Sequence, residues 1–142
     1  MNEIKKLEGI GGWLILFSIG LFVGLGINIQ ELLTDYGLNT SSDPVLEKII
    51  VFEDIGVAIG LIFLIIVIIN FFQKKRKVIN LIKYYYIYII SYSILDGIIV
   101  SSYFNMVNAV VIVPIIQAII SAAIWISYFQ RSVRVKNTFI ND

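Results

Sequence analysis

The chain has 142 residues, of which 58% are hydrophobic, and its formal net charge is +1. This is the length of one small domain, but the apolar share is too high for a water-soluble core, so the composition excludes an ordinary soluble protein. The sequence contains no Cys and no His. Their absence removes the thiolate nucleophile, the disulfide framework and the commonest general base and metal ligand. We therefore expect a protein that is not an enzyme, with no catalytic residues, no metal and no cofactor.

The apolar residues gather in four long runs. A helix rises about 1.5 Å per residue, so about 20 residues cross a hydrocarbon core about 30 Å thick. A membrane β-barrel would need apolar and polar residues in alternation, whereas these runs are apolar on every side. The sequence therefore predicts an all-α fold, an integral membrane four-helix bundle that forms one domain over residues 1–142. The expected spans lie at about residues 9–30, 49–72, 82–104 and 108–130.

The cationic residues predict the orientation of the bundle. Ten of the 11 Lys and Arg residues lie before the first span, between the second and third, or after the fourth, and Lys48 is the exception. Cytoplasmic loops are enriched in Lys and Arg, so both termini and the middle loop are predicted to face the cytoplasm. Residues 131–142 would then form a basic cytoplasmic tail.

Short connections and small residues indicate how the helices pack. The third and fourth spans are joined by only about residues 105–108, so they must be antiparallel neighbours. Small residues recur four positions apart within every span, which lets helices approach closely in lipid. These residues are Gly20 and Gly24, Gly56 and Gly60, Ser93, Gly97 and Ser101, and Ala118 and Ala122. They can pack the bundle itself or form the face of a homodimer.

Asp96 is the residue least expected at its position, near the middle of the third span. A charged carboxylate at that depth costs about 2.5 to 3.5 kcal/mol on insertion scales. Lys83 lies at the start of the third predicted span and no other Lys or Arg lies within a span, so the chain offers no ion pair at the depth of Asp96. Tyr92 lies one turn earlier, and Gln117 and Ser121 on the neighbouring span have similar depths. We expect Asp96, Tyr92, Gln117 and Ser121 to form one intramembrane polar cluster, with Asp96 facing the fourth span.

Two interpretations of this polar cluster stay open. The side chains can be hydrogen-bonding contacts between helices, of modest strength. Alternatively, Asp96 is a proton or cation site in a transport path, since ionisable groups inside membranes often mark such paths.

Two sequence motifs flank the spans. The first is Gly-Ile-Gly-Gly-Trp-Leu at residues 9–14, and the second is Tyr-Phe-Gln-Arg-Ser-Val-Arg-Val-Lys-Asn-Thr-Phe at residues 128–139. In both motifs the chain resembles a family of small bacterial membrane proteins catalogued as the domain of unknown function 2569 family. The resemblance covers the whole length and implies four spans and a multi-pass location in the bacterial inner membrane. It implies no activity.

By the predicted topology both motifs lie at the cytoplasmic interface and can build one site. Its expected members are Gly9, Gly11, Gly12, Trp13, Arg131, Ser132, Arg134 and Lys136. We expect the last helix to extend to about Val135, with Trp13 packed against this extension. Arg131 or Arg134 is expected to reach a phosphate group, the Glu8 side chain or nearby backbone carbonyls. Such a site suits anionic lipid head groups or an acidic partner segment, and the plainer alternative is a helix end held by interfacial cations and aromatic rings.

The sequence thus predicts a non-catalytic interaction or accessory subunit of the bacterial inner membrane. Its expected partners are the lipid bilayer, another membrane protein or a second copy of the chain, and no nucleic acid. The alternative function is a small transporter or a proton- or cation-conducting protein that uses Asp96.

Overall fold

The computed structural model describes residues 7–38, 43–105 and 107–142, and the side chains of these residues except 35–38. The described residues form four long helices and a short fifth one. They are α1 (Trp13–Leu38), α2 (Pro44–Phe72), α3 (Val78–Phe104), α4 (Ala109–Arg131) and α5 (Val133–Thr138). The cationic pair Lys5 and Lys6, used above to predict orientation, lies outside the described residues.

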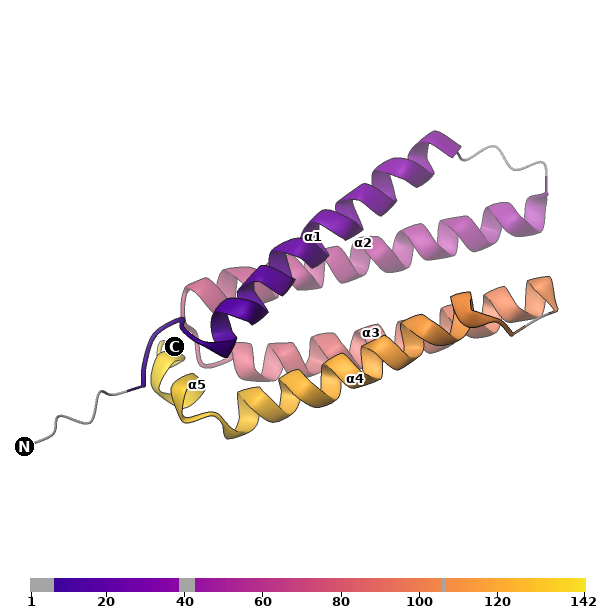
Figure 1. Ribbon diagram of the computed structural model, residues 1–142. Helices are drawn as coiled ribbons and strands as arrows, with labels where there is room; N and C mark the ends of the chain where they lie inside the picture. Colours follow the sequence, from indigo (N-terminus) through magenta and orange to yellow (C-terminus); the bar gives the residue numbers. More distant parts are fainter. Residues whose placement is uncertain (1–6, 39–42, 106) are drawn as a thin grey trace, which may run out of the picture.

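The four long helices form a bundle in chain order (Figure 1). α1 packs on α2, α2 on α3, and α3 on α4, so the predicted pairing of the third and fourth spans is confirmed. Each of the four is long and apolar enough to cross a membrane. The predicted fold class, an all-α four-helix membrane bundle, is therefore confirmed. The side of the membrane that each end faces stays a prediction.

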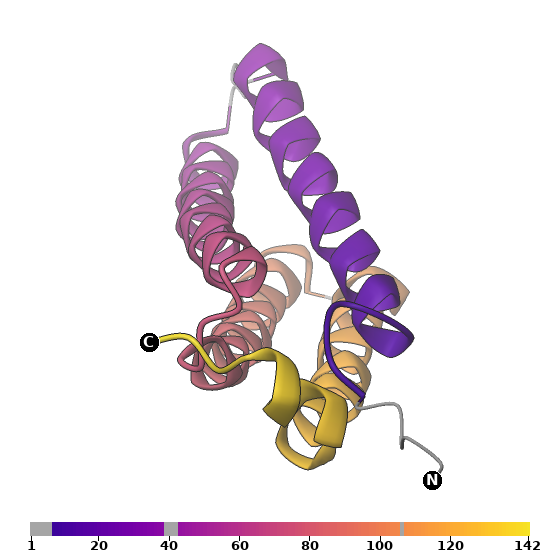
Figure 2. The ribbon, with the colours of Figure 1, turned by 90° about the vertical axis from the view of Figure 1, so that its left-hand side faces the viewer.

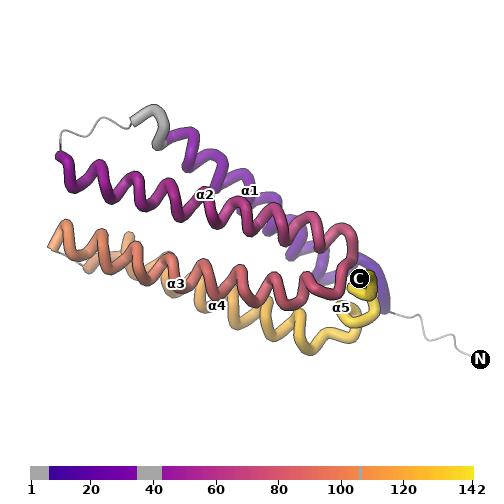
Figure 3. The backbone as a smooth tube through the Cα atoms, turned by 180° about the vertical axis from the view of Figure 1, so that it is seen from behind, coloured from indigo at the N-terminus to yellow at the C-terminus, as the bar shows by residue number. Residues whose placement is uncertain are grey.

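The two ends of the bundle differ. One end, called here the terminal end, holds the start of α1, the turn between α2 and α3, and α5 (Figures 1 and 2). The opposite end, called the distal end, holds the last turns of α1 and α3 and the first turns of α2 and α4. Towards the distal end α1 leans away from α3 and α4 (Figures 1 and 3). The helices are therefore held together most tightly at the terminal end.

The helices extend beyond the predicted spans. α1 continues to Leu38, whereas the first span was predicted to end near residue 30. α2 begins at Pro44, whereas the second span was predicted to begin near residue 49. Asp43 caps α2, because its carboxylate accepts a hydrogen bond of 2.8 Å from the amide of Val45. Pro44 occupies a first-turn position, where a missing N–H group breaks no helical hydrogen bond. α3 likewise begins at Val78, four residues before its predicted start.

Large apolar side chains cover the outside of the bundle on all four long helices. Leu33 is 71% exposed, Ile62 61%, Ile98 57% and Val110 75%. A water-soluble monomer rarely exposes contiguous apolar patches larger than a few hundred Å². Hydrocarbon is the solvent that fits this surface, as the predicted membrane location requires.

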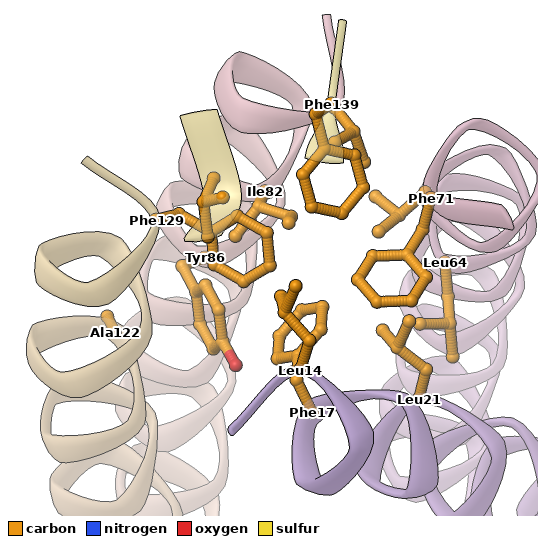
Figure 4. Close-up of a cluster of buried hydrophobic side chains, with 13 residues drawn as sticks. Leu14, Phe17, Leu21, Leu64, Phe71, Ile82, Tyr86, Ala122, Phe129 and Phe139 are labelled. Atoms are coloured by element: carbon orange, nitrogen blue, oxygen red, sulfur yellow. The ribbon is translucent and has the colours of Figure 1, made fainter. Parts of the chain in front are cut away.

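The best-packed part of the core lies at the terminal end (Figure 4). The ring of Phe17 on α1 lies 5.6 Å from that of Phe71 on α2 and 4.8 Å from that of Phe129 on α4, measured between centroids. Phe139, which follows α5, closes this group at 5.2 Å from Phe71 and 5.9 Å from Phe129. Phe139 is 1% exposed. Residues after the fourth span therefore form part of the core, rather than only the predicted basic tail.

The fourth long helix was predicted to continue to about Val135, and the structure shows that it ends earlier. α4 ends at Arg131, and Ser132 has an extended backbone with ψ 124°. The Ser132 hydroxyl oxygen accepts a hydrogen bond of 3.4 Å from the amide of Val135, which caps the new helix α5. Serine is a favoured N-cap because its oxygen satisfies an amide that has no helical partner. The break lets α5 turn across the end of the bundle and bury Val135 and Phe139.

Candidate functional sites

The Gly-Ile-Gly-Gly motif forms a turn that leads into α1. Gly9 and Gly12 have φ angles of 80° and 56°, a left-handed conformation that other residues adopt only with strain. Gly11 has a different reason to be glycine. A Cβ atom at this position would lie 2.5 Å from Nη1 of Arg134. Two glycines thus shape the turn, and the third makes room for an arginine.

The second motif hydrogen-bonds to this turn. Arg134 Nη1 donates to the carbonyl oxygen of Glu8 at 3.4 Å, Asn137 Nδ2 donates to Leu7 O at 3.2 Å, and Thr138 Oγ1 donates to Gly9 O at 3.3 Å. The contact expected of one of the two arginines is therefore present, and it is made to a backbone carbonyl. The structure brings the two motifs together at the terminal end.

Asn141 ties the same assembly to the turn between α2 and α3. Its carbonyl oxygen accepts a hydrogen bond of 2.7 Å from the amide of Arg76, and its own amide donates to Lys74 O at 3.2 Å. Its side-chain Nδ2 donates to Gln73 O at 2.8 Å. Three segments far apart in sequence, residues 7–12, 73–77 and 132–141, therefore form one unit, called here the terminal cap.

The cap has an exposed cationic surface. Its exposed cations are Lys74, Arg76, Lys77 and Lys136, and Arg131 at the end of α4 is exposed beside them. Arg134 is half-buried because it lies along the glycine turn. The predicted site residues thus divide by role. Gly9, Gly11, Gly12, Ser132 and Arg134 build the cap, whereas the side chains of Arg131 and Lys136 are exposed.

The sequence predicted that Trp13 packs against the segment that follows α4, but the structure places it against α4 itself. Its ring meets that of Trp125 within α4, edge to face, at 6.4 Å between centroids. Trp13 is 60% exposed, while Phe17 one turn later takes the central core position. An exposed tryptophan at the end of an apolar span is typical of a membrane interface.

The predicted intramembrane cluster is divided in two. The Asp96 carboxyl group lies close to that of Glu53 on α2, so it faces α2 and not α4. The Tyr92 hydroxyl group donates a hydrogen bond of 3.2 Å to the backbone oxygen of Glu53. One oxygen of Asp96 and one of Asp54 are buried and have no hydrogen-bond partner among the described residues.

Two tyrosine rings of α3 pack against Gly56 and Gly60 of α2. Gly56 lies directly beneath the ring of Tyr92, so a Cβ atom there would overlap the ring, and a Cβ at Gly60 would lie 3.3 Å from Tyr88. The Tyr88 hydroxyl donates to Gly56 O at 2.6 Å. The two tyrosine rings stack at 6.1 Å with an interplanar angle of 11°. Gly56 and Gly60 therefore serve packing within the chain, through aromatic rings and not through close helix backbones.

Gly97 explains why Asp96 faces α2. A Cβ atom at Gly97 would lie 3.0 Å from Val111 and 3.3 Å from Ile115, so this residue faces α4. Successive residues of an α-helix point about 100° apart, since a turn contains 3.6 residues. Asp96 is thereby rotated away from α4 and towards the neighbouring α2.

Gln117 and Ser121 lie instead on a cleft of about 540 Å³. All four long helices line it, α1 with Gly20 and Asn28 and α4 with Gln117, Ser121 and Trp125. The structure therefore separates these two polar residues of α4 from the Asp96 and Tyr92 pair.

A protein-family model described as "Protein of unknown function (DUF2569)" matches residues 7–140. The chain belongs to the DUF2569 family. The same comparisons find no matching curated protein and no matching solved structure.

The DUF2569 match includes nearly the whole terminal cap, since it begins at Leu7 and ends at Ile140. Asn141 lies just beyond it. Sequence reasoning missed two parts of this DUF2569 protein, Asn141 and the Glu53 partner of Asp96. The signal for Glu53 was its acidic side chain within the second predicted span, which could have suggested a pair with Asp96.

Proposed function

We propose that this DUF2569 protein is a non-catalytic interaction or accessory subunit of the bacterial inner membrane, and that the terminal cap is its cytoplasmic docking surface. The single observation that supports this function is the hydrogen-bonded junction of three chain segments in the cap. Side chains of the second motif donate to three successive carbonyl oxygens of Leu7, Glu8 and Gly9. A surface held this way is preorganised, which lowers the entropy cost of binding a partner.

The charge of the cap favours an acidic partner. Arg131, just before α5, and Lys136, within it, are both exposed, and the cationic turn at residues 74–77 is joined to the segment after α5 by Asn141. Arginine and lysine pair with carboxylates through charge-assisted hydrogen bonds. We therefore propose that the partner is a membrane protein with an acidic cytoplasmic segment.

Site-specific photo-crosslinking tests this function. Val133 on α5 is 60% exposed, so a photoreactive residue placed there samples the cap surface without removing a charge. The expected result is a discrete protein adduct in native membranes that is lost when Arg131→Gln and Lys136→Gln are added. A photoreactive residue at Val110, 75% exposed at the distal end, is the matched control and is expected to give no such adduct. Adducts to lipid alone at Val133, or a protein adduct unaffected by the charge changes, would contradict the proposal.

A second function rests on the carboxyl pair of Glu53 and Asp96. The pair lies between two helices and leaves one buried oxygen of Asp96 without a partner among the described residues. Such a group can take up and release a proton within the membrane. In this alternative the protein conducts protons or cations, and Asp96→Asn abolishes flux into reconstituted vesicles while the fold persists. Equal flux in the wild type and this variant, or none in either, would exclude it.

A further inference from the structure

The cleft between the helices has an opening that the rest of the bundle lacks. α1 contacts α2 and α4 contacts α3, but in the described residues no Cα atom of α1 comes within 8 Å of one of α4. Aromatic side chains join these two helices at the terminal end, with the ring centroids of Phe17 and Trp125 4.8 Å apart. The cleft lies beyond this aromatic contact, between two helices that do not close on each other.

Hydrogen-bonding groups without partners line this cleft. Gln117, Ser121 and Ser93 all belong to its wall, and none of their side chains forms a hydrogen bond with the described part of the chain. The three lie within a few residues of the middle of α3 and α4, at depths where bulk water does not reach. A polar group left unpaired in hydrocarbon costs several kcal/mol, so a hydrogen-bonding partner is expected in the cleft.

Among the described residues, none with a charged side chain lines the cleft. Those that form its wall have apolar, aromatic, hydroxyl and amide side chains. An ion moved from water into such a site without an opposite charge loses far more solvation energy than hydrogen bonds return. The chemistry of the wall therefore selects an uncharged ligand.

The dimensions of the cleft suit a lipid. From Phe17 to Asn28 the wall on α1 is about 16 Å long, at about 1.5 Å per residue. The cleft volume of about 540 Å³ lies in the range of small-ligand pockets. The length is about half of a bilayer core, the depth of one leaflet.

We propose that the cleft binds an uncharged membrane lipid that carries hydroxyl or carbonyl oxygens. The Gln117 amide and the Ser121 hydroxyl hydrogen-bond these oxygens, and the aromatic rings of Phe17, Tyr85 and Trp125 pack against the apolar body. The lipid enters sideways between α1 and α4. A diacylglycerol and an isoprenoid quinone share this chemistry. The site lies apart from the terminal cap, so it stands whether or not the cap binds a protein.

Photoreactive lipids test the proposal on the full chain in phosphatidylcholine nanodiscs. The probes are a photoreactive diacylglycerol, a photoreactive quinone and, as the charged control, a photoreactive phosphatidylglycerol. The expected result is that one or both neutral probes label peptides that line the cleft, and that the charged probe does not. The probe that labels identifies which of the two lipid sources the site takes.

Two glycines of α1 supply a matched pair of variants. A Cβ atom at Gly20 or at Gly26 would meet nothing within 4 Å, but only Gly20 lines the cleft. Gly20→Leu fills the cleft and is expected to lower neutral-lipid labelling at least tenfold, whereas Gly26→Leu leaves it unchanged. Gln117→Leu keeps the volume, removes the amide and is expected to lower labelling about fivefold, the effect of one hydrogen bond. Circular dichroism confirms that each variant is helical.

Three results would overturn the proposal. Equal labelling of Gly20→Leu and Gly26→Leu would remove the cleft as the site, and if Gly20→Leu does not fold, unchanged labelling of Gln117→Leu would do so. Phosphatidylglycerol labelling as strong as that of the neutral probes would remove the selection against charge. In native membranes, a photoreactive residue at Gln117 that crosslinks to a protein would show that a partner helix occupies the cleft.

Discussion

The hydroxyl group of Tyr103, in the last turn of α3, donates a hydrogen bond to the carboxylate of Asp43, which caps α2. This contact ties the two helices together at the distal end, where α1 has already leaned away (Figure 1). It also lowers the pKa of Asp43 below its ordinary value, because the ionised carboxylate accepts this bond and the amide bond from Val45.

The Asp43 contact predicts a pH dependence of stability at the distal end. A group whose pKa is lowered by folding stabilises the fold above its unfolded pKa, here 3.8, and this stabilisation is lost as pH falls through the lower folded value. Tyr103→Phe should therefore lower the melting temperature in detergent at pH 7 and have less effect as the pH falls below 3.8. Tyr84→Phe, on the exposed terminal end of α3, is the control. If Tyr103→Phe lowers the melting temperature equally at pH 7 and below pH 3.8, the prediction is contradicted.

Two glycines of the N-terminal half should respond to alanine in opposite directions. Gly12→Ala forces a Cβ atom into a left-handed conformation and should lower the free energy of unfolding by about 1 kcal/mol or more. Gly26→Ala lies in open space within α1, where alanine is the better helix former, and should raise it by about 0.5 to 1 kcal/mol. Reversible unfolding in mixed detergent micelles measures both. The same sign for both variants would show that the turn at Gly12 is not held in this conformation.

The aromatic residue after α5 should stabilise the bundle. Phe139→Ala removes a ring that is 1% exposed and contacts Phe71 and Phe129, so it should cost about 3 to 5 kcal/mol. Ile140→Ala changes the next residue, which is 58% exposed, and should cost less than about 0.5 kcal/mol. Unfolding in detergent again provides the measurement. Similar small costs for both variants would mean that residues 132–141 are not packed on the core.

Alanine should destabilise the fold more at Gly56 than at Gly60, the two glycines of α2 that face tyrosine rings. Gly56→Ala places a Cβ atom inside the ring of Tyr92, which is held between the rings of Phe52 and Tyr88 and cannot move freely. The expected cost is about 1 to 3 kcal/mol, the range for overpacking. Gly60→Ala meets the edge of Tyr88 at 3.3 Å and should cost less. If Gly60→Ala is the more damaging variant, the tyrosines do not pack as described.

The orientation of the bundle can be tested with single cysteines, because the chain has none of its own. Asn105 and Asn80 are both exposed, at the distal and terminal ends. Asn105→Cys should react with an impermeant thiol reagent added to intact cells, and Asn80→Cys should react only after the cells are opened, since cations gather at the terminal end. The reverse pattern would place the terminal end outside.

The number of spans and their pairing could be predicted because lipid sets the length of an apolar helix and a four-residue connection forces neighbours together. The rotation of each helix could not. In a soluble helix the apolar stripe marks the buried face, but lipid and protein core are equally apolar, so α3 carries no such stripe. Asp96 was therefore assigned to α4, although the structure turns it to Glu53 on α2.

The ends of the helices were missed for local reasons. Asp43 and Pro44 lie before the second predicted span, yet a capping side chain followed by proline begins a helix, as it does for α2. Ser132 lies where the last helix was expected to continue, and the break at this residue accompanies the burial of Phe139 in the core. That long-range contact is not visible in the local sequence around Ser132.

The position of Phe139 and Asn141 in the fold affects the order in which the protein can mature during synthesis. Residues 132–141 emerge from the ribosome after all four spans, at about 5 to 20 residues per second. Until they emerge, the rings of Phe71 and Phe129 lack their final neighbour and the turn at residues 73–77 lacks Asn141. Insertion into the membrane therefore precedes closure of the bundle, and a nascent chain halted after α4 would present an open aromatic core to the quality-control machinery.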